Sequence, residues 1–192
     1  MTSDDKARVA ALLAFWFGTP EAPDYNQPRE IWFTTDPAFD EALRQRFGSD
    51  RQRAAAGGCD GWLEECDPAL ALVLLLDQLP RNLFRGKAAA FATDAQARAA
   101  ARQARARGFD QAVPPVRRAF FYLPFEHSED LADQETSLRL FGALGDEEQL
   151  RYARRHHEII ARFGRFPHRN PALGRPSTAA EEAFLKEPFS SF

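Results

Sequence analysis

The amino-acid sequence predicts an all-α fold with about seven helices. Apolar residues recur at helical spacing in most segments; Val9, Leu12, Leu13 and Trp16, for example, fall on one face of a helix. Residues that start helices, such as aspartate before proline, and glycines that end them separate these segments. Valine, isoleucine and threonine are sparse, and no segment shows the sustained alternation typical of a β-strand. We expect the helices to be joined by short loops.

The first three predicted helices cover residues 4–17, 36–57 and 67–79. Gly18 follows the first helix at a position that favours a C-cap. An Asp-Pro dipeptide opens the second and third helices, because aspartate caps the first turn and proline is preorganised for it. The third helix is apolar nearly all round and is therefore expected to be buried. We expect Pro80 to stop it.

The remaining predicted helices open on side chains that can accept hydrogen bonds from the amides of the first turn: Thr93 or Asp94, Ser128, Asp146 and Thr178. Gly108 closes the first of these helices and Gly164 closes the third. Glu181 completes a capping box with the threonine three residues before it, ahead of a short final helix. Glu129 and Asp130 favour the first turn of the helix that follows Ser128.

Length and composition indicate one globular domain over residues 1–192. Hydrophobic residues make up 44% of the chain and charged residues 28%, and the formal net charge of −3 argues against binding to nucleic acid or an anionic membrane. The longest apolar run, residues 69–76, is far shorter than the roughly 18 residues of a membrane span. No signal sequence opens the chain, and its two cysteines have no redox or zinc spacing. We therefore expect a cytoplasmic protein.

A short pattern occurs twice. Residues 79–86 read LPRNLFRG, and residues 166–175 read FPHRNPALGR. Each has an apolar residue before proline, then Arg-Asn, then an apolar residue and an arginine beside a glycine. Pro80 and Pro167 are 87 positions apart, which is too long for one helical repeat and fits two units of roughly 34–47 residues. The repetition favours an array of helical hairpins with two equivalent helix ends.

Three segments mix aromatic and charged residues more densely than ordinary loops do: residues 77–86, 120–130 and 162–175. Buried charged groups need partners, so we expect these segments to meet one another. Trp16, Trp32 and the phenylalanine after each tryptophan are expected to be core residues, since large aromatic side chains are usually buried.

The phrases LLDQLPRNLFRG, FYLPFEHSEDL and HHEIIARFGRFPHRNPALGR resemble a bacterial family catalogued as domain of unknown function 924. The resemblance extends over nearly the whole chain, from LLAFWFG to STAAEEAFL. It implies an all-α fold similar to tetratricopeptide repeats, and it implies no established reaction. The phrases of the family map onto Asp77, Gln78, Arg81, Asn82, Arg85, Glu126, His127, Ser128, Glu129, His156, Arg165, Pro167, His168, Arg169, Asn170 and Arg175.

Our first hypothesis is a pocket that binds, and acts on, a small anionic metabolite. Converging arginines grip carboxylates or phosphates with two bonds each, and asparagine amides add direction. Imidazole and carboxyl groups supply proton transfer near neutral pH. The candidate acid–base residues are Glu126, His127 and His156. The candidate binding residues are Asp77, Arg81, Asn82, Arg85, Arg165, His168, Arg169, Asn170 and Arg175.

The alternative is a helical-repeat module for protein–protein interaction, in which the same residues form a structural ion-pair network. Arg81 and Arg169 would then pair with nearby acids and lock helix ends together, and a concave surface would hold a protein or peptide. The sequence does not distinguish an enzyme from a metabolite sensor or an adaptor, and it does not reveal the oligomeric state.

The sequence gives little support to a metal site, to nucleophilic catalysis or to a glycine-rich nucleotide site. His156 and His157 are adjacent on a helix and point about 100° apart, so they cannot chelate one ion together. There is no H-x-x-x-H pair, and only tertiary folding could gather His127, His156 and His168 into a metal site. The sequence contains neither a nucleophile elbow nor a glycine-rich phosphate motif. We therefore predict no metal and no cofactor.

Overall fold

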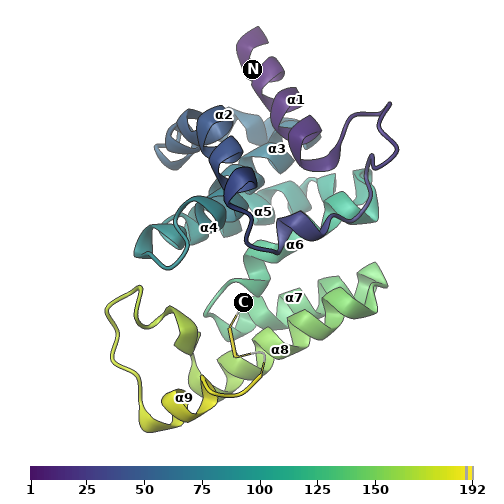
Figure 1. Ribbon diagram of the computed structural model, residues 1–192. Coiled ribbons are helices and arrows are strands. Elements are labelled where there is room, and N and C mark those ends of the chain that lie inside the picture. Colours follow the sequence, from purple (N-terminus) through teal and green to yellow (C-terminus); the bar gives the residue numbers. More distant parts are fainter. Residues whose placement is uncertain (189, 192) are drawn as a thin grey trace. The chain divides into compact units, whose positions relative to one another are not determined.

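The computed structural model describes residues 1–188, 190 and 191, and in that part of the chain it is helical, with no β-strand (Figure 1). Short 3₁₀ turns connect the longer helices. The all-α prediction is confirmed, and the similarity to tetratricopeptide repeats stays a prediction. The helices are α1 (Ser3–Phe17), α2 (Pro37–Ala55), α3 (Cys66–Val73), α4 (Leu79–Leu83), α5 (Asp94–Ala106), α6 (Pro115–Glu126), α7 (Leu131–Leu144), α8 (Glu147–Phe163) and α9 (Ala179–Phe184).

Internal contacts divide the chain into two compact units. The first contains residues 1–85 and 90–124, and the second contains residues 86–89 and 125–192. Helix α6 begins in the first unit and ends in the second. The assignment of residues 1–192 to one domain stays a prediction.

Local capping explains where several helices begin. The side chain of Asp36 accepts hydrogen bonds from two amides of the first turn of α2, and Asp146 does the same for α8. Thr178 and Glu181 form the predicted capping box of α9. A second capping box joins Thr2 to Asp5 and starts α1 slightly earlier than residue 4. These bonds satisfy amides that have no partner within the helix, so the sequence pattern suffices to predict them.

An aromatic cluster forms much of the core of the first unit. The Phe120 ring lies 5.8 Å from Trp16, 5.3 Å from Phe17 and 5.0 Å from Trp32, each in an edge-to-face arrangement that aromatic rings prefer. All four side chains are buried. The prediction that Phe33 belongs to this core is wrong, because its side chain is 68% exposed; its ring lies 6.3 Å from that of Trp32 in an edge-to-face arrangement.

The prediction that Pro80 stops the third helix is wrong, because the chain stays helical through Pro80. A π-helical turn over Leu74–Gln78 follows α3 and leads directly into α4. In this turn the amide of Leu79 donates to the carbonyl of Leu74, five residues back. Pro80 lacks the N–H that would donate to the carbonyl of Leu76 in an α-helix. The hydroxyl of Thr93 donates to that carbonyl at 2.6 Å, so tertiary structure compensates for the proline.

We predict that Thr93→Val lowers the free energy of unfolding by about 1–2 kcal/mol, because it leaves a buried carbonyl without this hydrogen bond while preserving side-chain shape. Urea denaturation followed by circular dichroism measures the change. Thr136→Val is the matched control, since its hydroxyl makes exposed hydrogen bonds within α7, donating to the carbonyl of Ala132 and accepting from Arg139. Equal effects of the two substitutions would contradict the role given to Thr93.

Helix α6 was not among the predicted helices. Pro115 occupies the first position of the helix, where a missing N–H costs nothing, and Pro124 lies inside the last turns. Phe120, in the middle of α6, belongs to the first unit, and Glu126, its last residue, belongs to the second. A helix with an internal proline is stable here because apolar residues on all its sides are buried.

Helices α7 and α8 lie side by side as a hairpin in the second unit (Figure 1). The N-cap of α7 is Asp130 rather than the predicted Ser128. The Ser128 hydroxyl instead accepts a hydrogen bond from the Asp130 amide and donates to Asp133 at 2.8 Å. Ile159, Ile160, Phe166 and Phe184 pack together and join α8 to the segment that follows it and to α9.

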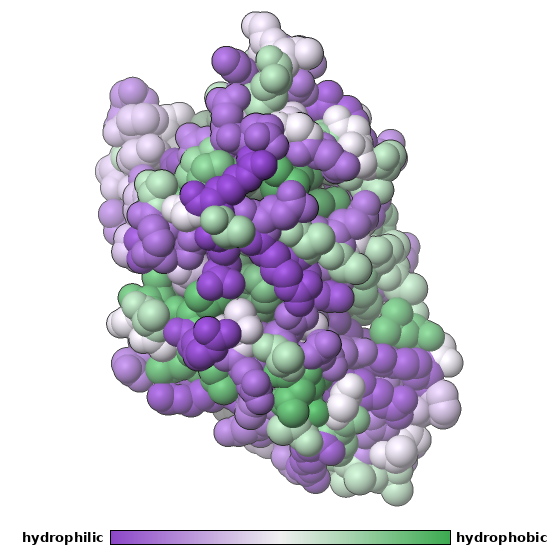
Figure 2. Space-filling view, turned by 180° about the vertical axis from the view of Figure 1, so that it is seen from behind, coloured by the Kyte–Doolittle hydropathy of each residue, from purple (hydrophilic) through white to green (hydrophobic). Residues whose placement is uncertain are grey.

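The surface is mostly hydrophilic on the face that Figure 2 shows, with hydrophobic residues in separate patches. Within the described residues, no helix combines the length and the apolar character that crossing a membrane requires.

Candidate functional site

Residues 77–86, 120–130 and 162–175, which mix aromatic and charged side chains, are here called the first, second and third polar segments. Arg81 of the first polar segment is held by two carboxylates of the first unit. Its Nη1 lies 2.9 Å from Asp94 Oδ1 and 3.3 Å from Asp77 Oδ1, and its Nη2 donates to Asp94 Oδ2 at 3.1 Å. Gln78 donates a further hydrogen bond to Asp77 at 2.6 Å. Both aspartates are buried, and buried charges need partners of opposite sign. These bonds tie the π-helical turn to the start of α5.

Asn82 and Arg85 share a different acid, Asp40 of α2. Asn82 Nδ2 donates to Asp40 Oδ1 at 2.8 Å. Arg85 donates through Nε to Oδ2 at 2.9 Å and through Nη2 to Oδ1 at 3.1 Å. The arginine therefore grips the carboxylate with two bonds, as predicted for an anionic ligand, but the acid belongs to the protein.

The third polar segment repeats this arrangement in the second unit. Arg175 donates to Glu129 through Nη1 at 2.7 Å and through Nη2 at 2.9 Å, and its Nε donates to Asn170 Oδ1 at 3.0 Å. The amide of Phe166 also donates to Glu129 at 2.8 Å. In each copy of the repeated pattern the last arginine thus grips one carboxylate of the chain with two bonds, while the asparagine bonds to that carboxylate in the first copy and to the arginine itself in the second.

Burial alone would raise the pKa of Glu129. Hydrogen bonds from Arg175 and from the Phe166 amide outweigh it, so this pKa lies below its ordinary value of 4.5. Arg165 likewise donates twice to Glu181, at 2.6 and 2.8 Å. Hydrogen bonds from Arg165 and from the Thr178 amide lower the pKa of Glu181 to about 2. These pairs fix the segment between α8 and α9.

The predicted acid–base residues come together in the second unit. Nδ1 of His156 lies 3.3 Å from Glu126 Oε1, and both side chains are buried. The rings of His127 and His156 are 6.4 Å apart. The end of α6, and with it Glu126, is fixed by Gln134 of α7, whose amide donates to the carbonyls of Glu126 at 2.6 Å and Ser128 at 2.7 Å.

The surroundings of His156 decide which ring nitrogen carries the proton. Nδ1 lies 2.9 Å from the carbonyl oxygen of Tyr152, which can only accept a hydrogen bond. Nδ1 therefore carries the hydrogen, and Nε2 is the basic nitrogen of the neutral ring. Burial lowers the pKa of His156 well below 6.5, so the ring is neutral at physiological pH.

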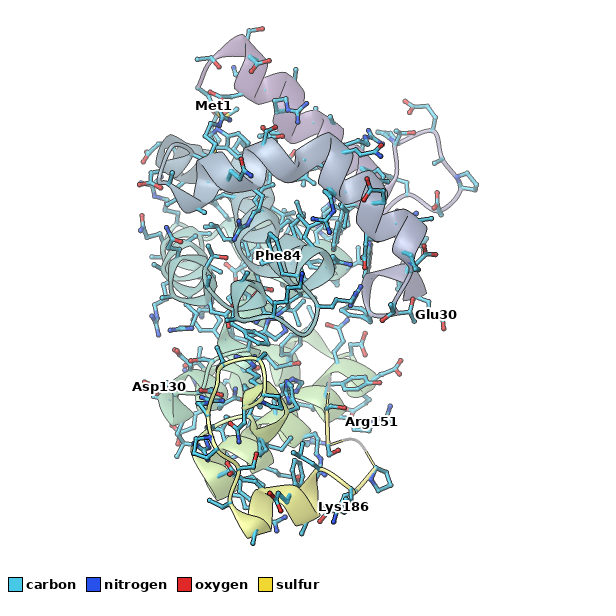
Figure 3. The ribbon with its side chains drawn as sticks, turned by 60° about the vertical axis from the view of Figure 1, so that its left-hand side comes forward. Met1, Glu30, Phe84, Asp130, Arg151 and Lys186 are labelled. Atoms are coloured by element: carbon cyan, nitrogen blue, oxygen red, sulfur yellow. The ribbon has the colours of Figure 1, made fainter. Side chains whose placement is uncertain are left out.

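Phe166 lies at the centre of this group of residues. The rings of His156 and His168 are 5.4 and 5.6 Å from its ring, and the Arg169 guanidinium lies 4.5 Å over it. Arg169 Nη2 donates to the His127 carbonyl at 3.0 Å. His127 and His168 are half-buried, whereas Arg169 is buried. Figure 3 shows the side chains of this unit, with Asp130 labelled at the start of α7.

Most of these residues were predicted from the sequence, but their partners were not. The second and third polar segments meet in the second unit, as expected; the first finds its partners in Asp40 and Asp94 of the first unit. Asp94 was predicted only as a residue at a helix start, and Asp40 was not predicted, although each is an acid in the first turn of a helix, which was a usable signal. Phe166 was also missed as the common contact of His156, His168 and Arg169.

In the described part of the chain, no three histidine, cysteine, aspartate or glutamate side chains are grouped so that they could hold a metal ion. Cys59 and Cys66 are both free thiols. The group around Phe166 presents imidazole, carboxylate and guanidinium side chains.

Comparison with protein families gives a match to "Bacterial protein of unknown function (DUF924)" over residues 12–189. The chain belongs to this family. The chain is similar to a solved structure, that of the "Protein of Unknown Function ATU0120 from Agrobacterium tumefaciens", which is 44% identical to it, with a TM-score of 0.88 over 96% of this chain and 100% of that one. No protein with a curated description matches the chain. The DUF924 assignment supports the fold and leaves the chemistry of the site to be argued from its geometry.

Proposed function

We propose that this DUF924 protein binds a small anionic molecule at the Glu126–His156 pair, in the cytoplasm, and transfers a proton to or from it. One observation carries the proposal. The buried His156 ring directs Nδ1 toward a backbone carbonyl and the Glu126 carboxylate, at 2.9 and 3.3 Å. This arrangement leaves Nε2 as a base of defined orientation.

The chemistry follows from this pair. A neutral imidazole accepts a proton through Nε2 and becomes an imidazolium. The carboxylate of Glu126 then stabilises the new positive charge, as the acid of a catalytic triad does. Because burial lowers the pKa of His156, the ring is in its basic form before the transfer.

The side chains around the pair favour an anion. The Arg169 guanidinium is held against Phe166, and the half-buried rings of His127 and His168 lie next to His156 and Phe166 respectively. A guanidinium and imidazole N–H groups are donors suited to carboxylate or phosphate oxygens. Because His127 and His168 are half-buried, a ligand from solvent contacts them before it reaches the buried Glu126–His156 pair.

The alternative function is a helical-repeat module that binds a protein or peptide. The internal pairs of Arg81, Arg85, Arg165 and Arg175 favour the ion-pair network that this alternative includes. In our proposal these four arginines shape the units, and the ligand is bound by the residues around Phe166.

A thermal-shift screen against carboxylates and phosphates tests binding. A ligand at 100 times its dissociation constant stabilises the protein by about 2.7 kcal/mol, which is roughly 5–10 °C for a chain of this length. We expect a selective shift in the wild type that is lost in Arg169→Gln, with Arg169→Lys as a second variant that keeps the charge. A flat screen, with Arg169→Gln strongly destabilised, would overturn the proposal in favour of the structural network.

Proton transfer is tested with His156→Asn, whose side-chain amide keeps a donor near Nδ1 but has no basic nitrogen. We expect this variant to bind the ligand found in the screen and to lose the exchange of ligand protons for deuterium, which proton NMR follows in D₂O. His157→Asn, the next residue on α8, is the matched control and should retain both properties. Exchange at the wild-type rate in His156→Asn would refute the role of His156.

A further inference from the structure

A hollow in the first unit is not used by the proposed function. Its volume is about 450 Å³, and it lies where the end of α1, the loop after it and α2 come together. Figure 3 labels Glu30, which directly follows the loop residue Arg29. Side chains of both charges and two aromatic rings line the hollow: Phe15, Asp24, Arg29, Phe39 and Arg46.

Arg46 is the feature of the hollow that points to a ligand. Its guanidinium lies 4.7 Å over the Phe15 ring and 5.3 Å over the Phe47 ring. Within residues 1–188, 190 and 191, no carboxylate lies within ion-pair distance of it. A guanidinium stacked on an aromatic ring uses its face for that contact and keeps its N–H donors in the plane. Arg46 is therefore held in position to bind an anion with two bonds.

Arg29 supplies a second, fixed positive charge. Its Nη1 donates to the carbonyls of Phe15 and Trp16 at 2.9 and 3.0 Å, where α1 ends. Its Nε lies 3.8 Å from Asp24, which is long for an ion pair with an exposed acid. Two arginines and one aspartate leave the hollow with a net positive charge.

The wall beside Arg46 is aromatic. The rings of Phe15 and Phe39 stack at 5.2 Å with an interplanar angle of 18°. Phe15 is half-buried, so part of its surface faces the hollow. A ligand that combines an anionic group with a flat apolar body satisfies both the guanidinium and the ring.

We propose that this hollow binds an aromatic or similarly flat carboxylate, with Arg46 on the carboxylate and the Phe15–Phe39 stack beside the apolar body. The site shares no residue with the Glu126–His156 pair. The test of this proposal is therefore independent of the tests of the proposed function.

Benzoate is the probe, and benzamide is its neutral counterpart of the same shape. The readout is the indole N–H signal of Trp32 in a proton–nitrogen NMR spectrum, because this group donates to the Trp16 carbonyl that Arg29 also contacts. Trp62, which does not line the hollow, is the internal control. Sodium chloride replaces sodium benzoate in matched steps to keep the ionic strength constant.

We expect a saturable shift of the Trp32 signal with benzoate, at least tenfold weaker binding of benzamide, and at least tenfold weaker binding of benzoate by Arg46→Gln. Arg46→Lys keeps the charge but not the planar guanidinium, so it should also bind benzoate more weakly than the wild type does. This variant replaces Arg46→Gln in the test if the glutamine variant does not fold. Arg139→Gln removes an exposed arginine of α7 and should bind as the wild type does. Equal binding of benzoate and benzamide, coinciding titrations of wild type and Arg46 variants, or no saturable shift would overturn the proposal.

Discussion

Replacing Phe120 by alanine is expected to lower the free energy of unfolding by about 3–5 kcal/mol. The side chain is 1% exposed and contacts Trp16, Phe17 and Trp32 at once. Its removal leaves a cavity at the centre of an aromatic cluster that rigid neighbours cannot fill. Such a loss is a large fraction of the roughly 5–15 kcal/mol that stabilises a typical domain. Urea denaturation followed by tryptophan fluorescence and by circular dichroism measures it.

Phe33→Ala is the matched control. Phe33 belongs to the same group of aromatic rings but is 68% exposed, so its removal should change the stability by no more than about 0.5 kcal/mol. If both substitutions cost the same, the cluster around Phe120 would not be the core of the first unit.

Arg175→Met is expected to cost about 2 kcal/mol at neutral pH, because it leaves the partly buried Glu129 carboxylate without its two charge-assisted hydrogen bonds. Arg151→Met is its control. Arg151 pairs with Glu148 at 3.5 Å on the surface of α8, and both side chains are about 70% exposed, so the expected change is below about 0.5 kcal/mol.

The cost of Arg175→Met should depend on pH with a defined sign. The pKa of Glu129 in the folded protein lies below its ordinary value of 4.5. A lowered pKa means that the carboxylate stabilises the fold above pH 4.5 and that this contribution is lost as pH falls through the folded pKa. The difference between wild type and Arg175→Met should therefore shrink below pH 4.5. A difference that stays constant from pH 7 to pH 3 would contradict the ion pair with Glu129.

The sequence pattern predicted some helix caps and missed others: Asp67 lies inside α3, Thr93 makes no capping bond, and Asp130 rather than Ser128 caps α7. Asp36, Asp146 and Thr178 cap the helices that they were predicted to cap, because a cap bonds to amides only two or three residues away. Pro80 was expected to stop a helix, and α6, which contains Pro124, was not predicted. In both places buried apolar neighbours, or a hydroxyl as distant as Thr93, offset the cost that proline imposes locally.

The candidate site was predicted as a set of residues and only partly as an arrangement. Glu126, His127 and His156 come together as expected, and so do His168 and Arg169. The other predicted ligand-binding arginines bond to carboxylates of the chain itself. Arg85 and its partner Asp40 are 45 residues apart, and no local pattern connects them.

The sequence by itself determined the all-α class, several capped helix starts and most residues of the candidate site. These properties depend on side-chain type, on helical periodicity and on bonds within a few residues. The tertiary structure decided which acid each arginine bonds to, that Phe33 is exposed although Trp32 beside it is buried, and which nitrogen of His156 is basic. The physical reason is that each of these depends on groups brought close by packing, since charge pairing, burial and hydrogen bonding act across space and not along the chain.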